Sequence, residues 1–522
     1  MKLLFYTLNF IAITVNAQFT NVMISDQNVP NEPALVIDPN NTNTIFAGSN
    51  SNNYYVSNDG GVTWAQNQLT STYGVWSDPA LLIDNSSNLY YFHLSYPNTS
   101  TTDIDDWIDR IVCQKSTDNG ITFNNGTFFG LSADGLKDQD KEWAQIDRNN
   151  GNIYVTWSEF DTYRDASPTC KSRILFVKSL DSGDTWSAPI KINDVDGNCI
   201  DEDLTVEGAM PTVGPNGEVY VAWAGPAGIV FNKSTDAGNT WLSSNILVDT
   251  MPTGWDYSIP GIDRCNGLPI LDCDISGGAY NGTLYVNWTD QRNGSNDTDV
   301  WLKKSTDGGN TWSNVVRVND DGVGNHQFLT WMDIDQTNGN IYIVFYDRRN
   351  HNDNNTDVYL ARSTDGGATF QNILISESPF VPTDNVFFGD YTNIAAHNGV
   401  IRPIWNRVHN GNSSIWTALI EDSNIVGIDD YFNVNFELNQ NYPNPAKDET
   451  YISFKLKSNE KVSLEIYNLL GEKKGVIFKD KIFTYGKHIV KIPFKDKNLT
   501  AGIYYYKLKI GNKEQTRKMV IN

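Results

Sequence analysis

Short apolar segments separated by polar turns run through most of the chain and predict β-strands. One set of segments has the form of IYVTWSEF or VYVAWAG, and a second set, such as DVWLKK and DVYLAR, follows it along the chain. Short runs that are rich in Val, Ile, Tyr and Trp and bounded by Gly, Asn and Asp are typical of strands in antiparallel sheets. We therefore expect an all-β fold.

An eight-residue turn motif recurs at a regular spacing and indicates the architecture. Its copies are SNDGGVTW, STDNGITF, SLDSGDTW, STDAGNTW, STDGGNTW and STDGGATF, which begin at Ser57, Ser116, Ser179, Ser234, Ser305 and Ser363. Their mean spacing of about 61 residues fits a four-stranded propeller blade with its loops. Asp can accept hydrogen bonds from turn amides and Gly permits a positive φ, so we expect each motif to form a turn between the third and fourth strands of a blade.

A seventh unit of the repeat lacks this turn motif. VIRPIWNRV, which begins at Val400, continues the strand series into SIWTALI, but no outermost strand follows. The segment FTNVMISDQ at residues 19–27 copies FQNILISES, the strand after the sixth motif. We therefore predict a seven-bladed β-propeller over residues 18–422, with the N-terminal strand completing the last blade and closing the ring.

The turn motif resembles the Asp box of sialidases and related propellers. Residues 28–420 resemble bacterial sialidase-like repeat proteins, notably in QFLTWMDID, YDRRN and FFGDYTNIAAHNGVIRPIW. The resemblance implies a carbohydrate-active protein. Sialidases have six blades, an Arg-Ile-Pro element and an arginine triad, whereas this chain has seven repeat units, no such element and no arginine in its first blade. Because one fold serves many functions, sialic acid cleavage does not follow from the resemblance.

Both ends of the chain carry signals for export. Lys2, an apolar run and the small residue Ala17 predict a signal peptide over residues 1–17. After a linker at 423–435, period-two segments over 436–522 predict a small β-sandwich. This tail resembles the C-terminal sorting domain of the type IX secretion system of Bacteroidetes, in QNYPNP, IYNLLG and AGIYYYKL. That resemblance implies the secretion machinery as a partner, passage through the periplasm, and a secreted or outer-membrane surface product.

Charge separates the two regions. Residues 431–522 hold 17 Lys and Arg against 9 Asp and Glu, which leaves 22 against 53 for residues 1–430. A surface this acidic repels phosphate, so no nucleic acid is expected as a partner of the large region. Apart from the signal peptide, no apolar stretch is long enough to span a membrane. We expect a monomer.

The strand order places the candidate chemistry on one face of the propeller. The turn motifs belong to the opposite face, so their aspartates are scaffold. Charged and aromatic residues stand where the innermost strands begin and converge on one channel: Asn31, Glu32, Asp78, Lys141, Glu142, Trp143, Glu207, His326, Gln327, Asp390 and Tyr391. Carboxylates from different blades could form the acid and base of glycoside hydrolysis. Alternatively, several of them tie loops together or hold a cation.

Arginines follow the second strands on the same face and could bind an anionic sugar with bidentate hydrogen bonds. They are Arg292, Arg348, Arg349 and Arg407, and Lys141 and Trp143 are further substrate-binding candidates. DQRNGSNDTDV and DRRNHNDNNTDV are alike, so local pairing between Asp and Arg is the competing explanation. We expect at most two of the four arginines to meet a ligand.

Three functions are compatible with these residues. A glycoside hydrolase acting on an anionic or complex glycan would draw a carboxylate pair from Asp78, Glu142, Glu207 and Asp390. A uronate lyase would use His326 or Tyr391 as its base. A non-catalytic propeller would only bind glycan or protein.

The sequence predicts no cofactor, although calcium could bind in the Asp/Asn-rich loops near Asp297 or Asp353. In an oxidising compartment, Cys265 could bridge Cys273, and Cys170 could bridge Cys199, while Cys113 is left over as a buried thiol.

Overall fold

The structure is a computed structural model that describes residues 19–96, 108–133, 135–425, 436–456, 458–469, 471–495, 499–510 and 513–522. The chain divides into two compact units, Met1–Ile425 and Val426–Asn522. The expected signal peptide and residues 426–435 of the expected linker lie outside the described residues. Apart from a 3-10 turn at Asp422–Asn424, the described elements are strands, which confirms the all-β fold.

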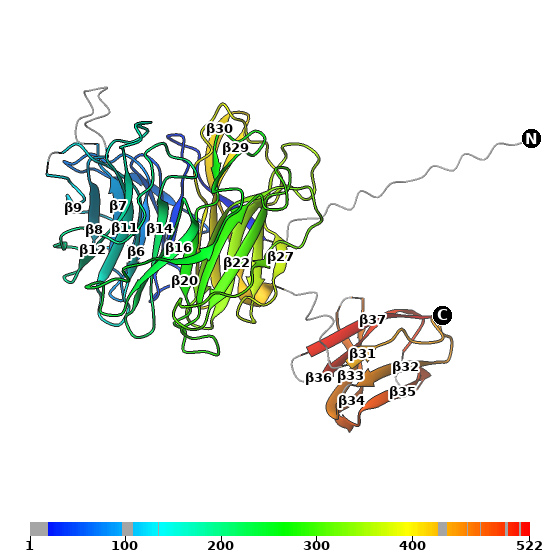
Figure 1. Cartoon of the computed structure of the whole chain (residues 1–522). Coiled ribbons are helices and arrows are strands. Elements are labelled where there is room, and N and C mark those ends of the chain that lie inside the picture. Colours follow the sequence, from blue (N-terminus) through cyan, green and yellow to red (C-terminus); the bar gives the residue numbers. More distant parts are fainter. Residues whose placement is uncertain are drawn as a thin grey trace, which may run out of the picture. The chain divides into compact units, whose positions relative to one another are not determined.

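The first unit contains seven four-stranded antiparallel sheets, each called a blade below (Figure 1). Blades one to three comprise β2 (Ala34–Ile37), β3 (Ile45–Ser49), β4 (Asn53–Ser57), β5 (Ala65–Gln68); β6 (Ala80–Ile83), β7 (Leu89–Leu94), β8 (Ile111–Ser116), β9 (Thr127–Phe129); and β10 (Asp138–Ile146), β11 (Ile153–Phe160), β12 (Ser172–Ser179), β13 (Ile190–Lys191). Blades four to six comprise β14 (Glu207–Val213), β15 (Val219–Gly225), β16 (Gly228–Ser234), β17 (Ile246–Asp249); β20 (Ile270–Cys273), β21 (Leu284–Asp290), β22 (Asp299–Ser305), β23 (Val316–Arg317); and β24 (Gln327–Asp335), β25 (Asn340–Asp347), β26 (Asp357–Ser363), β27 (Gln371–Leu374).

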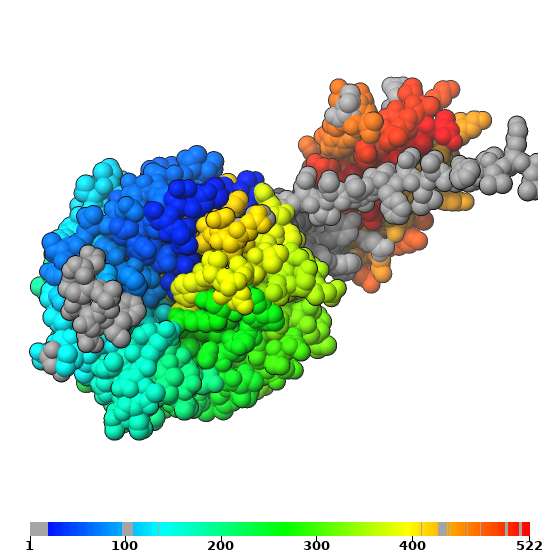
Figure 2. Space-filling model, turned by 90° about the horizontal axis from the view of Figure 1, so that it is seen from above, coloured from blue at the N-terminus to red at the C-terminus, as the bar shows by residue number. Residues whose placement is uncertain are grey.

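The seventh blade joins the two ends of the first unit. It is formed by β28 (Asn393–His397), β29 (Val400–His409), β30 (Asn412–Glu421) and, as its outermost strand, β1 (Thr20–Ser25). β1 pairs antiparallel with β30, with Thr20 opposite Leu419. In Figure 2 the first residues of this unit, in blue, lie beside the last ones, in yellow. The innermost strands β2, β6, β10, β14, β20, β24 and β28 contact one another in turn, and β28 contacts β2 again, so the ring is closed.

The six repeated motifs form the turns between the third and fourth strands, and each uses the same hydrogen bonds. In the first, the Ser57 hydroxyl donates to Asp59 at 2.8 Å and accepts from the Gly61 amide at 2.9 Å. Asp59 also accepts from the amide and hydroxyl of Thr63, at 2.9 and 2.7 Å. These contacts explain why the pattern needs Ser, Asp, Gly and Thr at this spacing. The carboxylate is fully engaged in its own turn.

The second unit is a two-layer sandwich with its own core. One sheet contains β31 (Phe436–Leu438), β32 (Glu449–Leu456) and β35 (Gly486–Pro493). The other contains β33 (Glu460–Asn468), β34 (Lys473–Phe483), β36 (Gly502–Ile510) and β37 (Lys513–Ile521). Alternate residues of both layers, such as Phe454 and Leu464, are fully buried between them.

One of the two suggested disulfides forms. Cys170 and Cys199 are bonded, with their Cα atoms 5.7 Å apart. The suggested bridge between Cys265 and Cys273 is wrong, because both thiols are free and buried. Cys265 belongs to β19 (Cys265–Asn266), which pairs with β18 (Asp256–Tyr257), and Cys273 ends β20. The extended backbone of β20 therefore separates the two residues despite their short spacing in the sequence.

Ring closure gives a testable prediction. Ile24 of β1 is 7% exposed and packs into the core between the first and seventh blades, whereas its neighbour Met23 is 45% exposed. We expect Ile24→Ala to lower the free energy of unfolding by about 2–5 kcal/mol, because it leaves a cavity. All 15 Trp lie at or before residue 416, so Trp fluorescence during urea unfolding reports on the first unit alone. Met23→Ala is the control, and an equal effect of both variants would contradict the role of β1.

Candidate functional site

The innermost strands of five blades share an unusual backbone position. In each of the first three blades, the residue two positions before the regular pairing with the second strand has a positive φ. These residues are Glu32 (49°) before Ala34, Asp78 (56°) before Ala80, and Lys141 (53°) before Trp143. The position recurs in blades four and six, where it holds Gly208 and Leu329. Three neighbouring blades thus present a charged side chain at a point where the backbone favours glycine.

A positive φ at a residue other than glycine costs of order 1–3 kcal/mol, and such positions cluster at functional sites. Glu32, Asp78 and Lys141 are also buried, at 3%, 7% and 5% exposure. Burying a charged group adds a desolvation cost. The protein therefore carries two separate penalties to place these three groups around one opening.

The three groups line a cavity of about 360 Å³. Its walls also include Asp140 from β10, Leu94 at the end of β7, and side chains from loops next to the strands. These further lining residues are Trp76, Ser77, Leu94, Ile108, Tyr163, Arg164, Asp263, Arg264 and Phe387. The cavity thus combines carboxyl groups, three basic side chains and exposed aromatic rings.

Lys141 is the electrostatic centre of the site. Its Nζ lies 3.0 Å from Asp390 Oδ2, 3.5 Å from Asp78 Oδ2 and 3.7 Å from Asp140 Oδ1. The Tyr391 hydroxyl donates to Asp78 Oδ1 at 3.4 Å. Carboxyl groups from the second, third and seventh blades therefore meet at one ammonium group. This is a convergence that only the closed ring allows.

Arg264 reinforces this network from a loop. Its guanidinium donates through Nε to Asp390 Oδ1 at 2.7 Å and through Nη2 to Asp390 Oδ2, and its Nη1 reaches Asp201 Oδ2 at 2.9 Å. The Tyr163 hydroxyl donates to the same Asp201 oxygen at 2.6 Å. Asp390 is thus held by two cations, which lower its pKa despite its burial.

Burial and like charges move the other carboxyl groups in the opposite direction. Burial, together with repulsion from Asp78, raises the pKa of Asp140 to about 7, although Lys141 opposes the shift. Burial and the charges of Asp78 and Asp390 raise the pKa of Glu32 well above its usual value. Two carboxyl groups with raised pKa values, Glu32 and Asp140, therefore lie close to Asp390, whose pKa is lowered. Such pairs are typical of acid–base catalysis.

The structure brings together only part of the predicted catalytic set. Asp78, Asp390 and Tyr391 belong to the network just described, together with Lys141, which was predicted to bind substrate. Glu142 and Glu207 are each 1% exposed and are not among the cavity-lining residues. Burial raises the pKa of both, and neither oxygen of Glu142 has a hydrogen-bond partner in the part of the chain that the structure describes.

His326 lies elsewhere, on the loop before β24. Its Nδ1 is 2.9 Å from the Thr298 hydroxyl, and its carbonyl accepts from the Arg348 amide at 3.0 Å. Burial and the charge of Arg348 lower its pKa to about 4. This histidine is therefore neutral near pH 7 and does not line the cavity.

The four predicted substrate-binding arginines hold their own blades and neighbouring segments together and do not line the cavity. Arg292 pairs with Asp249 and Asp290, and Arg349 pairs with Asp347 and Asp320. Arg348 donates to the Pro260 carbonyl at 2.8 Å and to the Thr356 hydroxyl at 3.0 Å. Arg407 donates to the Ser378 hydroxyl at 2.9 Å and lies over the ring of Trp416. This is the local pairing that the sequence left open.

Trp143 packs against two aromatic rings next to the site. Its ring centroid lies 4.7 Å from that of Trp331 and 5.0 Å from that of Tyr391. Trp143 and Trp331 line both a small cavity below Lys141 and Asp390 and a separate cavity of about 540 Å³ among the innermost strands. That second cavity contains Asp272 and Asp333. Trp143 and Trp331 are therefore shared by the walls of the small cavity and of the 540 Å³ cavity.

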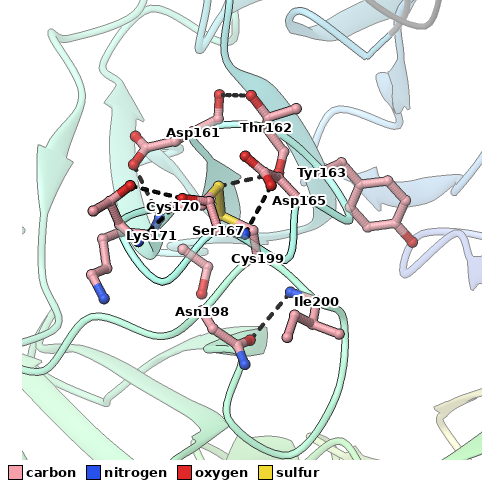
Figure 3. Close-up of a disulfide and its surroundings, with 12 residues drawn as sticks. Asp161, Thr162, Tyr163, Asp165, Ser167, Cys170, Lys171, Asn198, Cys199 and Ile200 are labelled. Carbon is pink, nitrogen blue, oxygen red and sulfur yellow. Dashed lines mark hydrogen bonds between the residues drawn. A yellow bond between two sulfur atoms is a disulfide. The ribbon is translucent and has the colours of Figure 1, made fainter.

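The disulfide holds two loops of the site together (Figure 3). Cys170 ends a loop that begins at Asp161 and carries Tyr163 and Arg164, and Cys199 precedes Asp201. The Arg164 amide also donates to the Cys199 carbonyl at 2.8 Å. The disulfide thus links the two segments whose side chains meet at the Tyr163–Asp201 hydrogen bond. Because Asp201 also pairs with Arg264, and Arg264 pairs with Asp390, the disulfide supports Asp390 indirectly.

The described residues contain no group of three or more His, Cys, Asp or Glu side chains that could hold a metal ion. At the suggested calcium loops, Asp297 accepts from the Gly324 amide at 2.9 Å, and Asp353 accepts from the amide of Asn355 at 2.9 Å. Both carboxylates thus stabilise loop backbone.

Sequence reasoning missed the groups that come from long loops. Arg264, Asp201, Tyr163 and Asp263 lie outside the repeated strand pattern, so nothing in the period marked them. Asp140 was overlooked although it precedes Lys141 directly. The segment between β17 and β20 is the longest of these connections among the described residues, but the one between β27 and β28 is nearly as long, so length alone did not mark it.

The tail matches a known family. Residues 440–522 match the family described as "Secretion system C-terminal sorting domain". This implies export and a secreted or cell-surface protein. No helix among the described residues has the length and apolar character needed to cross a membrane. No curated protein matches the chain.

Solved structures similar to the chain include sialidases and other proteins. A sialidase from Streptococcus pneumoniae is 9% identical, with 73% of this chain and 84% of that chain covered and a TM-score of 0.43. An α-L-arabinofuranosidase from Fusarium graminearum is 12% identical, with 68% and 97% covered and a TM-score of 0.41. A protein of unknown function from Dyadobacter fermentans is 12% identical, with 78% and 98% covered and a TM-score of 0.43. Likenesses this distant say nothing about activity.

The positive φ of Glu32 gives a prediction about stability. Its pKa is raised above the usual 4.5, so the folded state loses stability as the pH rises above that value. We expect Glu32→Gln to stabilise the first unit, with a gain that is small near pH 4 and grows towards pH 7. Glu32→Gly should be more stable still, by about 1 kcal/mol, because glycine tolerates this φ. Trp-monitored urea unfolding at several pH values measures both, and a gain that is independent of pH would contradict the assignment.

The disulfide gives a prediction about the shape of the site. We expect Cys170→Ser combined with Cys199→Ser to increase hydrogen exchange at residues 161–171 and 198–205, because the two loops lose their covalent link. Hydrogen exchange followed by mass spectrometry measures this directly. Cys113→Ser, which removes a buried free thiol in β8, is the control and should leave those segments unchanged. Unaltered exchange in the double variant would show that the loops do not depend on the bond.

Proposed function

We propose that the protein is an extracellular glycoside hydrolase whose active site is the cavity around Lys141. The observation that supports this most is that two carboxyl groups, Asp78 and Asp140, both contact the Lys141 ammonium group, and that the pKa of Asp140 is raised to about 7. Hydrolysis of a glycosidic bond needs a carboxyl group that gives a proton to the leaving oxygen and a second one that activates water or attacks the sugar. A donor with a pKa near the working pH performs this step best.

In this mechanism Asp140 is the proton donor and Asp78 is the second carboxyl group. Lys141 and the Tyr391 hydroxyl fix Asp78, and Lys141 stabilises negative charge on whichever carboxyl group has lost its proton. Asp390 orients Lys141 and Arg264 and remains ionised throughout because both cations lower its pKa. It acts as a positioning residue. Tyr391 has a raised pKa and is buried, so it serves as a hydrogen-bond donor.

The walls of the cavity suit a sugar ring. Trp76 and Phe387 are each 38% exposed although both are large aromatic residues that line the cavity. Aromatic faces combined with a few fixed polar groups are typical of sites that bind small ligands. The two rings provide apolar contact for the C–H face of a sugar, while the carboxyl groups accept hydrogen bonds from its hydroxyls.

The same geometry supports a lyase less well. Elimination from a uronate requires a cation free to neutralise the sugar carboxylate and a base within reach. His326 and the four second-strand arginines do not line the cavity, and Tyr391 is hard to deprotonate. For its location, we propose that the type IX machinery exports the protein through its tail to the cell surface or the medium.

The activity and its pH dependence test this proposal. We expect release of reducing ends from at least one member of a panel of extracted algal, plant and host polysaccharides. The rate should fall as the pH rises through about 7, because Asp140 then loses the proton that it donates. Asp140→Asn should lower the rate by about 100-fold or more.

A matched control is available in the separate cavity among the innermost strands. The pKa of Asp272 is also raised to about 7, mainly by burial, but this residue lines the separate 540 Å³ cavity. Asp272→Asn should therefore leave the rate and its pH profile unchanged. No release from any polysaccharide, or equal activity of Asp140→Asn and the wild type, would refute the hydrolase and leave a binding protein.

A further inference from the structure

Carboxyl groups outnumber basic groups around the cavity. Four carboxyl groups line it, from Glu32, Asp78, Asp140 and Asp263, and Asp201 and Asp390 lie directly behind them in contact with its basic residues. The basic lining residues are Lys141, Arg164 and Arg264. Carboxyl groups thus outnumber basic groups by two to one.

Each of the three basic side chains is already committed to carboxylates. Lys141 contacts Asp390, Asp78 and Asp140 within 3.7 Å. Arg264 bridges Asp390 and Asp201 and also lies over the ring of Phe387. Arg164 pairs with Asp201 at 3.3 Å. An incoming sugar carboxylate or sulfate that displaced Lys141 or Arg264 would take a counter-ion from the buried Asp390, which is a strongly unfavourable exchange. Arg164, whose side chain is 60% exposed and which shares Asp201 with Arg264, is the one basic lining residue left for such a group.

A positively charged ligand faces the opposite situation. An amino group on a sugar would be attracted by the excess carboxyl groups, and it would lie in a low-dielectric cavity where charge interactions are strong. Trp76 and Phe387 would contact the same ring, and aromatic faces attract cations as well as C–H groups. The amino group can approach the carboxyl groups, and the sugar ring can approach the two aromatic rings, without breaking an existing ion pair.

From this arrangement we infer that the cavity selects a sugar by charge: it binds protonated amino sugars best, neutral sugars less well, and uronates, sulfated sugars or sialic acids worst. The inference deepens the proposed hydrolase and rests on the same cavity. It also replaces the anionic glycan expected from the sequence, because the arginines on which that expectation rested are already paired with other protein groups and do not line the cavity.

Binding to charge-matched glycans tests the inference independently of catalysis. The probes are β-1,4-glucose, β-1,4-glucosamine and β-1,4-glucuronate oligosaccharides of equal length, together with the corresponding galactose, galactosamine and galacturonate series. The full-length protein is titrated with each at low and high salt. We expect the amino member of at least one series to bind roughly tenfold or more tightly than its uronate member, with a difference that shrinks at high salt.

Variants link the preference to this cavity. Asp263→Asn removes one lining carboxyl group without an exchange of size, and it should reduce the ratio of amino-sugar to neutral-sugar affinity several-fold. Asp333→Asn, in the separate cavity among the innermost strands, is the matched control and should leave the ratio unchanged.

The outcomes are distinct. Tightest binding of a uronate member, or no binding in either series, would overturn the inference. Binding in the expected order without any release of reducing ends would support the inference while refuting the hydrolase. Release of reducing ends from a uronate polymer without an unsaturated product that absorbs in the ultraviolet would support the hydrolase and overturn the inference. Release with such a product would indicate a lyase and overturn both.

Discussion

The pairing of β1 with β30 is the constraint on which the rest of the first unit depends. A ring of sheets has no free edge only if its first and last blades are joined, and here the join is made by backbone hydrogen bonds between segments almost 400 residues apart in the sequence. The consequence reaches the site directly. Asp390 comes from the seventh blade, Asp78 from the second and Lys141 from the third, so their ion pairs exist only while the ring is closed. Glu32 of the first blade accepts from the Asp390 amide across the same join.

The sequence was most informative where the structure repeats. Strand alternation and the Ser-x-Asp turn motif were enough to predict an all-β fold with these turns between third and fourth strands. The likeness of FTNVMISDQ to FQNILISES pointed to the strand position that β1 occupies. These signals work because each blade solves the same local problem, so the same residue types return at the same spacing. The convergence of Asp78, Lys141 and Asp390 followed from strand order alone.

The remaining part of the site could not be predicted, because it depends on departures from the repeat. Arg264 and Asp201 lie on loops whose paths are set by tertiary contacts and by the Cys170–Cys199 bond. The second-strand arginines misled for a related reason. Their type and position suited an anion, but whether a guanidinium faces a ligand or its own blade is decided by which carboxylate lies nearest. For Arg292 and Arg349 that partner is an aspartate two residues earlier in the chain.

The backbone conformation and the buried charge of three residues in this cavity both lower the stability of the fold. Residues that are kept at such a cost favour a functional role. A purely structural ring position would hold glycine, as at Gly208, or an apolar residue, as at Leu329. Instead, Glu32, Asp78 and Lys141 combine a positive φ with burial of charge, and the desolvation is offset only in part by ion pairs. Ion pairs alone do not require this placement, since the exposed faces of the blades could carry them at no such cost. Three costly residues in consecutive blades, all facing one cavity, are what a site that must handle protons and charge would require.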